Sequence, residues 1–239
     1  MKRRNFWVGG VTCLLALPLL VPVFFMRDPW PTGLRDQYEA STLEETGARN
    51  VVSAIYLGYR AYDTAGEVIV LFLAVMGTLF VMRATSAQTL GRLAWEASEC
   101  PNRHAPIMRL ITSKLGPVIL VFGLYVMSFG FASPGGGFQG GAVVASGIIC
   151  IAFGYLASRA QARHVMHRLH QVEVFAFMLL VAAFCSGMAT GRGFLANPFS
   201  RSDLQPVVFI TLLNIVIGIK VGVSIGLLSI GMFAGDVNE

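Results

Sequence analysis

Long apolar stretches constrain the fold of this chain more than any other feature of its sequence. A helix needs about 20 mostly apolar residues to cross a hydrocarbon core about 30 Å thick, because each residue adds about 1.5 Å. Charged residues make up only 13% of the chain, about half their share of a soluble domain. The sequence therefore predicts an all-α integral membrane protein with about six transmembrane helices. The stretches that meet or approach the required length are residues 6–26, 64–81, 110–130, 138–157, 171–190 and 206–233.

The distribution of lysine and arginine predicts how these helices cross the membrane. If the six stretches alternate in direction, the basic segments 2–4, 83–114 and 159–168 fall on one side, as loops or tails, and the acidic segment 28–45 falls on the other. Basic loops favour the cytoplasm, so both termini are expected there. The formal net charge of +5 thus reflects topology, and no nucleic-acid partner is indicated. Because no cleavage pattern follows the first stretch, we interpret it as a retained anchor.

Three parts of the chain differ in composition. Residues 1–83 hold two of the apolar stretches, residues 106–239 hold four, and the polar connector 84–105 is long for a helix hairpin. Residues 50–62 have helical composition but are too few to span, so we expect an interfacial or re-entrant helix there. No internal repeat is visible, which weighs against a self-sufficient transporter of the inverted-repeat type.

Residue types that form catalytic, metal or cofactor sites do not occur at suitable spacings. The four cysteines are scattered without a CxxC pair, so we expect them to be packing residues. His164, His167 and His170 lie at helical spacing in an arginine-rich segment without an acidic or cysteine ligand, which favours a solvated face over a metal site. We therefore expect no catalytic residue, no metal and no cofactor, and assign any redox chemistry to partner subunits.

The second apolar stretch begins with ionisable residues. Its apolar part, residues 68–81, gives about 21 Å of helix, less than the core thickness. Glu67, and Asp63 with it, must then lie within or at the edge of the hydrocarbon. Arg60, Asp63 and Glu67 share one helical face, and two carboxylates in a low dielectric retain a proton or attract a cation. This pattern is typical of a proton or sodium relay.

A structural interpretation also exists for this face. Asp63 is equally well explained as the first turn of the helix, near its positive dipole end, with Arg60 as an exposed partner. For Glu67, one turn deeper, we favour a functional or inter-subunit role.

Two further ionisable residues lie in the apolar stretches. Lys220 lies near the middle of the last one, where a lysine requires a carboxylate, a hydrated cavity or a neutral state, and such lysines often mark ion pathways. The alternative is a structural ion pair with another subunit. Asn214 adds a second polar group to this stretch on a different face. Glu173 begins the fifth stretch; it either pairs with Arg168 at the membrane surface, which we favour, or points inward as a relay carboxylate.

Residues 133–141 read SPGGGFQGG and concentrate glycine between the third and fourth stretches. Glycine permits backbone conformations and close approaches that other residues forbid. The segment lacks the lysine and the serine or threonine of a phosphate-binding loop. Physical argument alone favours a close-packed turn over a place where an ion or a partner's backbone comes near. The members of this glycine-rich packing loop are Pro134, Gly135, Gly136, Gly137, Phe138, Gln139, Gly140 and Gly141.

The same segment carries a resemblance to a known family. SPGGGFQGGAVVASG resembles the signature of the MnhB/MrpB family, the B-type component of the multisubunit Mrp-type Na+/H+ antiporters, and of the equivalent component in membrane-bound hydrogenases and related respiratory complexes. The resemblance covers about residues 106–239 and includes Glu173 and Lys220. The family usually has a histidine where this chain has Phe131, so any role of that histidine in proton movement is absent or relocated here.

Residues 42–83 separately resemble the C-terminal portion of the large A-type component of the same antiporters. The chain thus resembles a fusion of two neighbouring parts of one ion-translocating module, joined by connector 84–105. The residues that carry this second resemblance are Thr46, Gly47, Asn50, Val51, Val52, Ala54, Ile55, Arg60, Asp63, Thr64, Gly66, Glu67 and Val70.

The resemblance implies a non-catalytic, multi-pass subunit of a complex in a prokaryotic inner membrane, packed beside large antiporter-like subunits and other small subunits. The implied ion is Na+ or H+, and the sequence does not choose between them. The alternative is a purely structural subunit in the membrane arm of a redox-driven, hydrogenase-like pump related to complex I. The candidate residues for an ion pathway are Asp63, Glu67, Lys220, Glu173, Arg60 and Asn214.

Overall fold

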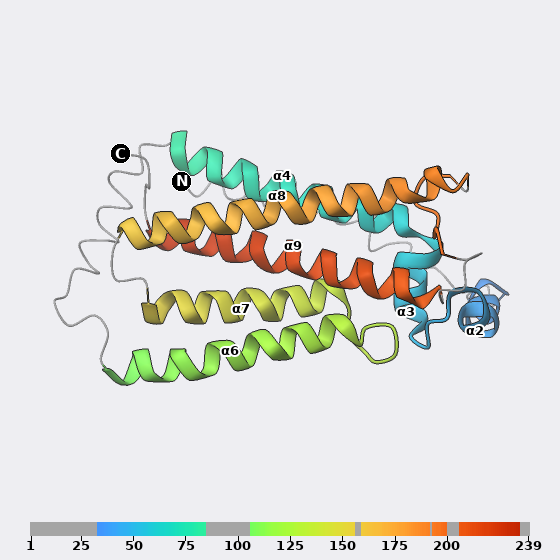
Figure 1. The fold of residues 1–239 in the computed structure, drawn as a ribbon, viewed down its shortest axis with the longest axis horizontal. Coiled ribbons are helices and arrows are strands. Elements are labelled where there is room, and N and C mark those ends of the chain that lie inside the picture. The colour runs from blue at the N-terminus through green and yellow to red at the C-terminus, as the bar shows by residue number, and fades with distance from the viewer. Residues whose placement is uncertain (1–32, 85–105, 156–158, 192, 200–205, 235–239) are drawn as a thin grey trace, which may run out of the picture. The chain divides into compact units, whose positions relative to one another are not determined.

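The computed structural model describes residues 33–84, 106–155, 159–191, 193–199 and 206–234, which are helices joined by short turns, without a strand. The all-α prediction is thereby confirmed for this part of the chain. Contacts divide the chain into a unit ending at Gln37 and a unit beginning at Tyr38, which holds the five long helices. The helices (Figure 1) are α2 (Gly33–Thr46), α3 (Val51–Ala54), the π-helical η1 (Ile55–Tyr59), α4 (Ala61–Ala84), α6 (Pro106–Ser128), α7 (Gly137–Tyr155), α8 (Arg159–Ala189) and α9 (Val207–Ala234).

Five of these helices are long and apolar enough to cross a membrane. They correspond to five of the six predicted stretches, which are thereby confirmed. The remaining stretch, residues 6–26, and the connector 84–105 lie outside the described residues. The cytoplasmic location of the termini stays a prediction. The segments of sufficient length and hydropathy are Ala61–Val81, Arg109–Ser128, Gly137–Gly154, His164–Ala189 and Val207–Met232.

Helix α9 forms the core of the unit that begins at Tyr38. In its apolar segment 67% of the residues are buried, compared with 17% in α4. It packs against α7, α8, α4 and α6. Figure 1 shows α9 between α7 and α8. Leu213, Ile217 and Val221 of α9 belong to the hydrophobic core. Three polar side chains on α9, those of Asn214, Lys220 and Ser224, are therefore surrounded by protein.

Glycines let α7 approach its two neighbours closely. A Cβ atom at Gly140 would lie 2.9 Å from the carbonyl oxygen of Gly123 on α6, and one at Gly141 would lie 2.8 Å from that of Gly218 on α9. Neither distance leaves room for a side chain. Small residues serve the same purpose wherever membrane helices pack backbone against backbone.

Two segments differ from, or refine, the sequence prediction. Helix α8 begins at Arg159, so the basic segment 159–168 is helical and not a loop. This segment contains no glycine or proline that would stop a helix. The helix therefore extends beyond the apolar stretch on its N-terminal side. The short helix expected at residues 50–62 is present as α3 and η1, and it is separated from α4 at Arg60, where the backbone leaves the helical region with φ −125°.

Candidate functional site

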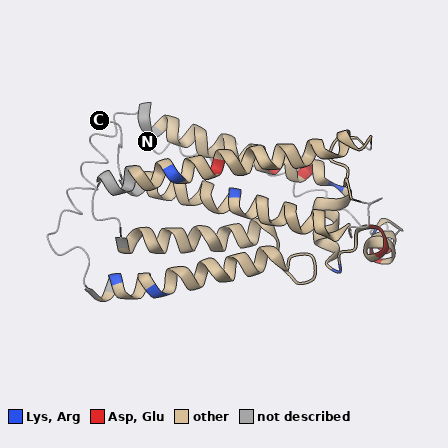
Figure 2. Ribbon diagram, in the orientation of Figure 1, with Lys and Arg blue, Asp and Glu red and all other residues tan. Residues whose placement is uncertain are grey.

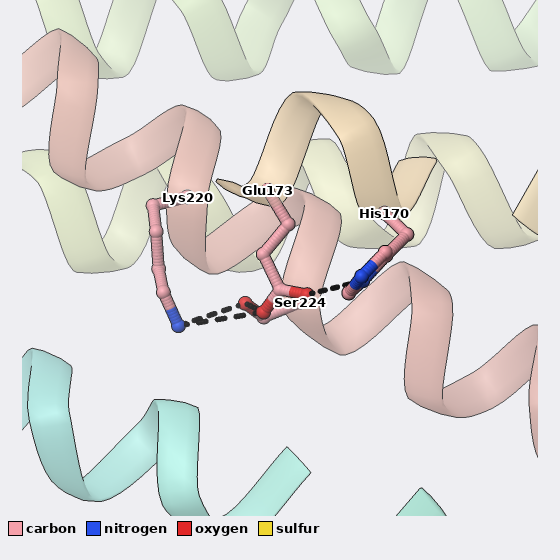
Figure 3. Close-up of polar contacts among 4 residues, drawn as sticks. All are labelled: His170, Glu173, Lys220 and Ser224. Atoms are coloured by element: carbon pink, nitrogen blue, oxygen red, sulfur yellow. Dashed lines mark hydrogen bonds and ion pairs between the residues drawn. The ribbon is translucent and has the colours of Figure 1, made fainter. Parts of the chain in front are cut away.

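Helices α8 and α9 bring three polar side chains together inside the protein. The Lys220 ammonium nitrogen (Nζ) donates a hydrogen bond to Ser224 Oγ at 3.0 Å, and the Ser224 hydroxyl donates one to Glu173 Oε1 at 2.6 Å. Lys220 Nζ also lies 3.6 Å from that carboxylate oxygen. All three residues have an exposed fraction of 0%. Figure 3 shows these residues, the charged cluster, with Glu173 and Lys220 on either side of the Ser224 hydroxyl.

Sequence spacing and helix packing produce the charged cluster. Lys220 and Ser224 are four residues apart on α9, so their side chains lie on one face. Glu173 comes from α8, which packs along α9. On the α4 side, Lys220 Nζ lies 5.4 Å from the centre of the Phe72 ring, within range of a cation–π contact. A buried ion pair loses its hydration and persists only where hydrogen bonds replace it, and the Ser224 hydroxyl provides one to each partner.

The position of Glu173 corrects a prediction. Its favoured pairing with Arg168 at the membrane surface is wrong, because Glu173 is fully buried whereas Arg168 is exposed. Of the three environments expected for Lys220, the structure shows a carboxylate, and this carboxylate belongs to the same chain instead of another subunit. Ser224 was missed by sequence reasoning, although its i+4 spacing from Lys220 on an otherwise apolar helix was visible in the sequence.

One carboxylate oxygen of the charged cluster has no hydrogen-bond partner among the described residues. The second carboxylate oxygen of Glu173, Oε2, is buried and has no hydrogen-bond partner in the described part of the chain. His170 Nδ1 lies 3.7 Å from it, and the His170 side chain is 48% exposed. Figure 3 shows the imidazole on the side of the carboxylate away from Lys220. Within the described ranges, no three His, Cys, Asp or Glu side chains gather as a metal ion requires.

A second group of polar side chains surrounds Asn214, nearer the start of α9. The Asn214 side-chain oxygen accepts hydrogen bonds from the Tyr56 hydroxyl at 2.6 Å and from the Gly137 backbone N–H at 2.8 Å. The Ser53 hydroxyl donates to the carbonyl oxygen of Gly130 at 2.6 Å. Burial raises the pKa of the Tyr56 phenol, so it remains a neutral donor. These residues, with Asn50, form what we call the neutral cluster.

Asn50 ties α3 to the turn before α7. Its side-chain nitrogen donates to the carbonyl oxygens of Gly130 at 2.8 Å and Ser133 at 2.9 Å, and its oxygen accepts the Val52 N–H that begins α3. Its backbone N–H donates to the carbonyl oxygen of Phe131 at 2.9 Å. Phe131, which stands where the family usually has histidine, is half-buried against the hydrophobic core. An apolar ring therefore occupies this position.

The geometry of the glycine-rich loop agrees with the close-packed turn. Gly136 has φ +150°, and a Cβ atom there would collide with the Tyr56 hydroxyl. A Cβ atom at Gly137 would lie 2.8 Å from the carbonyl oxygen of Asn214. Phe138 packs against the hydrophobic core, whereas Pro134 and Gln139 are exposed. The atoms that approach Gly136 and Gly137 from outside the loop belong to Tyr56, Asn214 and Ile217 of the same chain.

The acidic face of α4 lies apart from both clusters. Arg60 Nη2 and Asp63 Oδ2 form an ion pair at 2.5 Å, with both side chains exposed. Glu67 is exposed and makes no ion pair with any described residue. The Arg60–Asp63 pair in the first turn agrees with the structural interpretation of Asp63. The chain by itself thus joins Glu173 to Lys220 but connects neither Glu67 nor Asn214 with them.

Residues 107–227 match the protein family described as "Domain related to MnhB subunit of Na+/H+ antiporter", which covers about half of the chain. An uncharacterized protein of Methanocaldococcus jannaschii is 28% identical over 193 residues, or 72% of each chain. A probable K(+)/H(+) antiporter A/B subunit of Rhizobium meliloti is 25% identical over 205 residues. That match covers 78% of this chain but only 20% of the relative.

Two solved structures contain a similar fold. One is the membrane-bound sulfane sulfur reductase, an archaeal respiratory membrane complex, in which one chain matches with a TM-score of 0.64 and 25% identity, covering 96% of this chain and 97% of that one. The other is the Mrp complex from Dietzia sp. DQ12-45-1b, with a TM-score of 0.62 and 20% identity, covering 95% of this chain and 26% of the matched chain.

Proposed function

The chain belongs to the family of domains related to the MnhB subunit of Na+/H+ antiporters, and from this premise we propose that it is a non-catalytic membrane subunit of a multisubunit cation/proton-translocating complex. It is a multi-pass protein of a prokaryotic membrane. Its proposed partners are large antiporter-like subunits and other small membrane subunits, with Na+ or H+ as the ion. Reactions other than transport belong to those partners.

The buried charged cluster is the observation that supports a direct role of this chain in ion movement. Glu173 and Lys220 are buried within segments that are long and apolar enough to span the membrane. Ionisable groups at that depth are costly, and membrane proteins retain them chiefly along ion and proton pathways. The hydrogen bonds run without a break from Lys220 through Ser224 to Glu173. We assign the cluster to a proton path.

The hydrogen bonds specify how a proton moves within the cluster. The Lys220 ammonium gives a proton to Ser224 Oγ while the Ser224 hydroxyl gives its own to Glu173 Oε1, which leaves a neutral amine, an intact hydroxyl and a carboxylic acid. The reverse transfer, with the hydroxyl turned toward Lys220, restores the ion pair. Both states avoid an isolated charge in a low dielectric, so the transfer does not require one buried ion to stand alone.

The acidic face of α4 is proposed as a second part of the pathway. Glu67 lies on an exposed face among apolar side chains such as Val70 and Leu73, where an ionised carboxylate cannot face lipid without a large cost. A partner subunit or a hydrated cation therefore accompanies Glu67, and Asp63 with Arg60, in the complex. In membrane vesicles that hold the complete complex, Glu67→Gln is expected to slow ion movement while the complex stays assembled.

The division of the chain into residues 1–83, connector 84–105 and residues 106–239 is proposed in the same terms. The family match at 107–227 falls within the last part. The relative in Rhizobium meliloti carries the designation A/B, which supports a chain that joins an A-like part to a B-like part.

The experiment that tests this function replaces Glu173 with Gln in the complete complex. The amide still accepts a hydrogen bond from Ser224 but takes up no proton, so we expect a loss of cation-dependent proton movement per assembled complex in membrane vesicles. Less complex should assemble, because the buried Lys220 loses its carboxylate. A matched control is Glu44→Gln, which makes the same change at an exposed residue of α2. If Glu173→Gln vesicles transport at the parent rate, the charged cluster is not part of the path.

The alternative, a structural subunit of a redox-driven pump, is favoured by one observation. The similar chain of known structure at 25% identity belongs to an archaeal respiratory membrane complex. Purification through a tag after Glu239, in mild detergent, separates the two: redox subunits that co-purify identify a redox-driven pump, and antiporter-type subunits alone identify an antiporter.

A further inference from the structure

The charged cluster has one end at which a buried oxygen atom lies near an exposed side chain. Glu173 Oε1 receives the Ser224 hydroxyl, whereas Oε2 is buried without a hydrogen-bond partner in the described residues. A buried carboxylate oxygen without a donor is unfavourable, so such an atom calls for a specific explanation. The side chain that faces it is His170, with Nδ1 at 3.7 Å.

The position of His170 suits proton exchange. It precedes Glu173 by three residues on α8, so both side chains lie on the same face. Its ring is about half exposed, whereas Glu173 is fully buried. Imidazole takes up and releases protons near neutral pH more readily than any other side chain. His164 and His167, on the same helix, are also exposed, but no ion pair joins either to Glu173 in the described part of the chain.

We propose that His170 is the proton port of the charged cluster, the group that passes protons between water and Glu173 Oε2. This inference rests on the proposed function and adds the residue through which that path opens. A protonated His170 gives its Nδ1 proton to Oε2 while the carboxyl group releases a proton from Oε1 to Ser224, which passes one on to a neutral Lys220. His170 ends neutral, Glu173 stays a carboxylic acid and Lys220 ends charged, so protons and charges balance. Unlike the transfer within the cluster, this step adds one charge to it, which Lys220 carries until a proton is released again.

The Lys220 side of the charged cluster faces no exposed titratable group in the described residues. Lys220 faces the Phe72 ring, which neither donates nor accepts a proton. Ser224 is fully buried and already bonds to both charged partners. In the described chain, the contact between Glu173 and His170 is therefore the link from this cluster to an exposed titratable group.

The test compares His170→Gln with His167→Gln in vesicles that contain the complete complex. Uptake of radioactive sodium is measured, with rubidium as a second probe and with strong buffer holding the pH equal on both sides. We expect His170→Gln to lower the initial rate about tenfold or more, since a positioned proton donor contributes at least that much to a transfer step. His167→Gln should keep the parent rate, and both variants should assemble normally.

Chemical rescue separates a proton port from a structural role. Imidazole in the buffer should restore transport in His170→Gln and leave Glu173→Gln inactive, because a free base replaces the port but not the buried carboxyl group. Parent transport by His170→Gln, or an absence of rescue in both His170→Gln and the smaller His170→Ala, would overturn the inference alone. Parent transport by Glu173→Gln would overturn the proposed function with it.

Discussion

Helix α9 carries two buried polar clusters that are built in different ways. The neutral cluster at Asn214 joins uncharged side chains to backbone groups of Gly130 and Gly137. The charged cluster at Lys220 consists of side chains alone. Each cluster holds one buried side-chain atom without a hydrogen-bond partner in the described residues, Asn214 Nδ2 and Glu173 Oε2. In Figure 2 the blue band of α9 and the red band of α8 mark the two charged helices of the charged cluster.

This difference teaches what each cluster is suited to do. Bonds to backbone carbonyl and N–H groups fix the distance between helices, and an amide or a phenol does not change its charge near neutral pH. Side chains that exchange protons change their charge without displacing the backbone. The neutral cluster therefore stabilises the packing of α3, η1, α7 and α9, whereas the charged cluster has the chemistry that the proposed transport role requires.

The largest expected effect comes from Gly137→Leu in the neutral cluster. A side chain at Gly137 would overlap the carbonyl oxygen of Asn214 at 2.8 Å and Ile217 Cβ at 3.0 Å, so α7 and α9 must separate. We expect loss of the assembled complex, measured as subunits that co-purify with a tagged partner. Gly77→Leu on α4, where a Cβ meets nothing within 4 Å, is the matched control. Normal assembly of Gly137→Leu would show that close packing here is dispensable.

A pair of substitutions in the charged cluster has the next largest effect. Lys220→Met alone leaves the buried Glu173 carboxylate without its cation, which costs about 3–5 kcal/mol unless the carboxylate takes up a proton. We expect less assembled complex with Lys220→Met and recovery of assembly, without transport, in the double variant Lys220→Met/Glu173→Gln. Thermal unfolding of the purified complexes measures the first effect and vesicle uptake the second. A double variant that transports would remove the functional distinction between the clusters.

The smallest effect is expected from Tyr56→Phe. It removes one hydrogen bond to the Asn214 oxygen, which keeps the Gly137 N–H, so we expect a loss of about 1 kcal/mol in stability. Transport should stay at the parent rate because no ionisable group is changed in the charged cluster. A thermal shift assay detects the first result. A strong transport defect with normal stability would instead place the neutral cluster in the ion path.

The sequence predicted how far along its helix each residue lies better than which side of the helix its side chain faces. The apolar stretches located α4, α6, α7 and α9 closely, because a span needs a fixed length of apolar residues. The depth of Lys220 predicted a carboxylate, a hydrated cavity or a neutral state, and the structure provides the carboxylate. Which carboxylate depends on how α8 is rotated against α9, and one sequence does not contain that angle, so Glu173 was placed at the surface. The start of α8 was missed because polarity marks the end of a span and not the end of a helix.

The neutral cluster was less predictable for a similar reason. Glycine spacing indicated that something approaches the backbone at residues 135–137, but Tyr56 and Ser53 are distant in sequence and carry no local signal. A short helix was expected within residues 50–62, and α3 and η1 form it at residues 51–59. Their partner on α9 became visible only once Asn214 was placed beside Gly137 in space.

The neutral cluster joins residues 50–56 to residues 130–137 and 214 within a single polypeptide, and this has a consequence for how the protein is made. Parts linked in one chain are synthesised in equal numbers and meet at an effective concentration on the order of millimolar, without a diffusional search. Neutral hydrogen bonds worth about 1 kcal/mol each are then enough to hold them together. The same contacts between two separate polypeptides would have to provide the whole binding affinity, and their stoichiometry would depend on balanced expression.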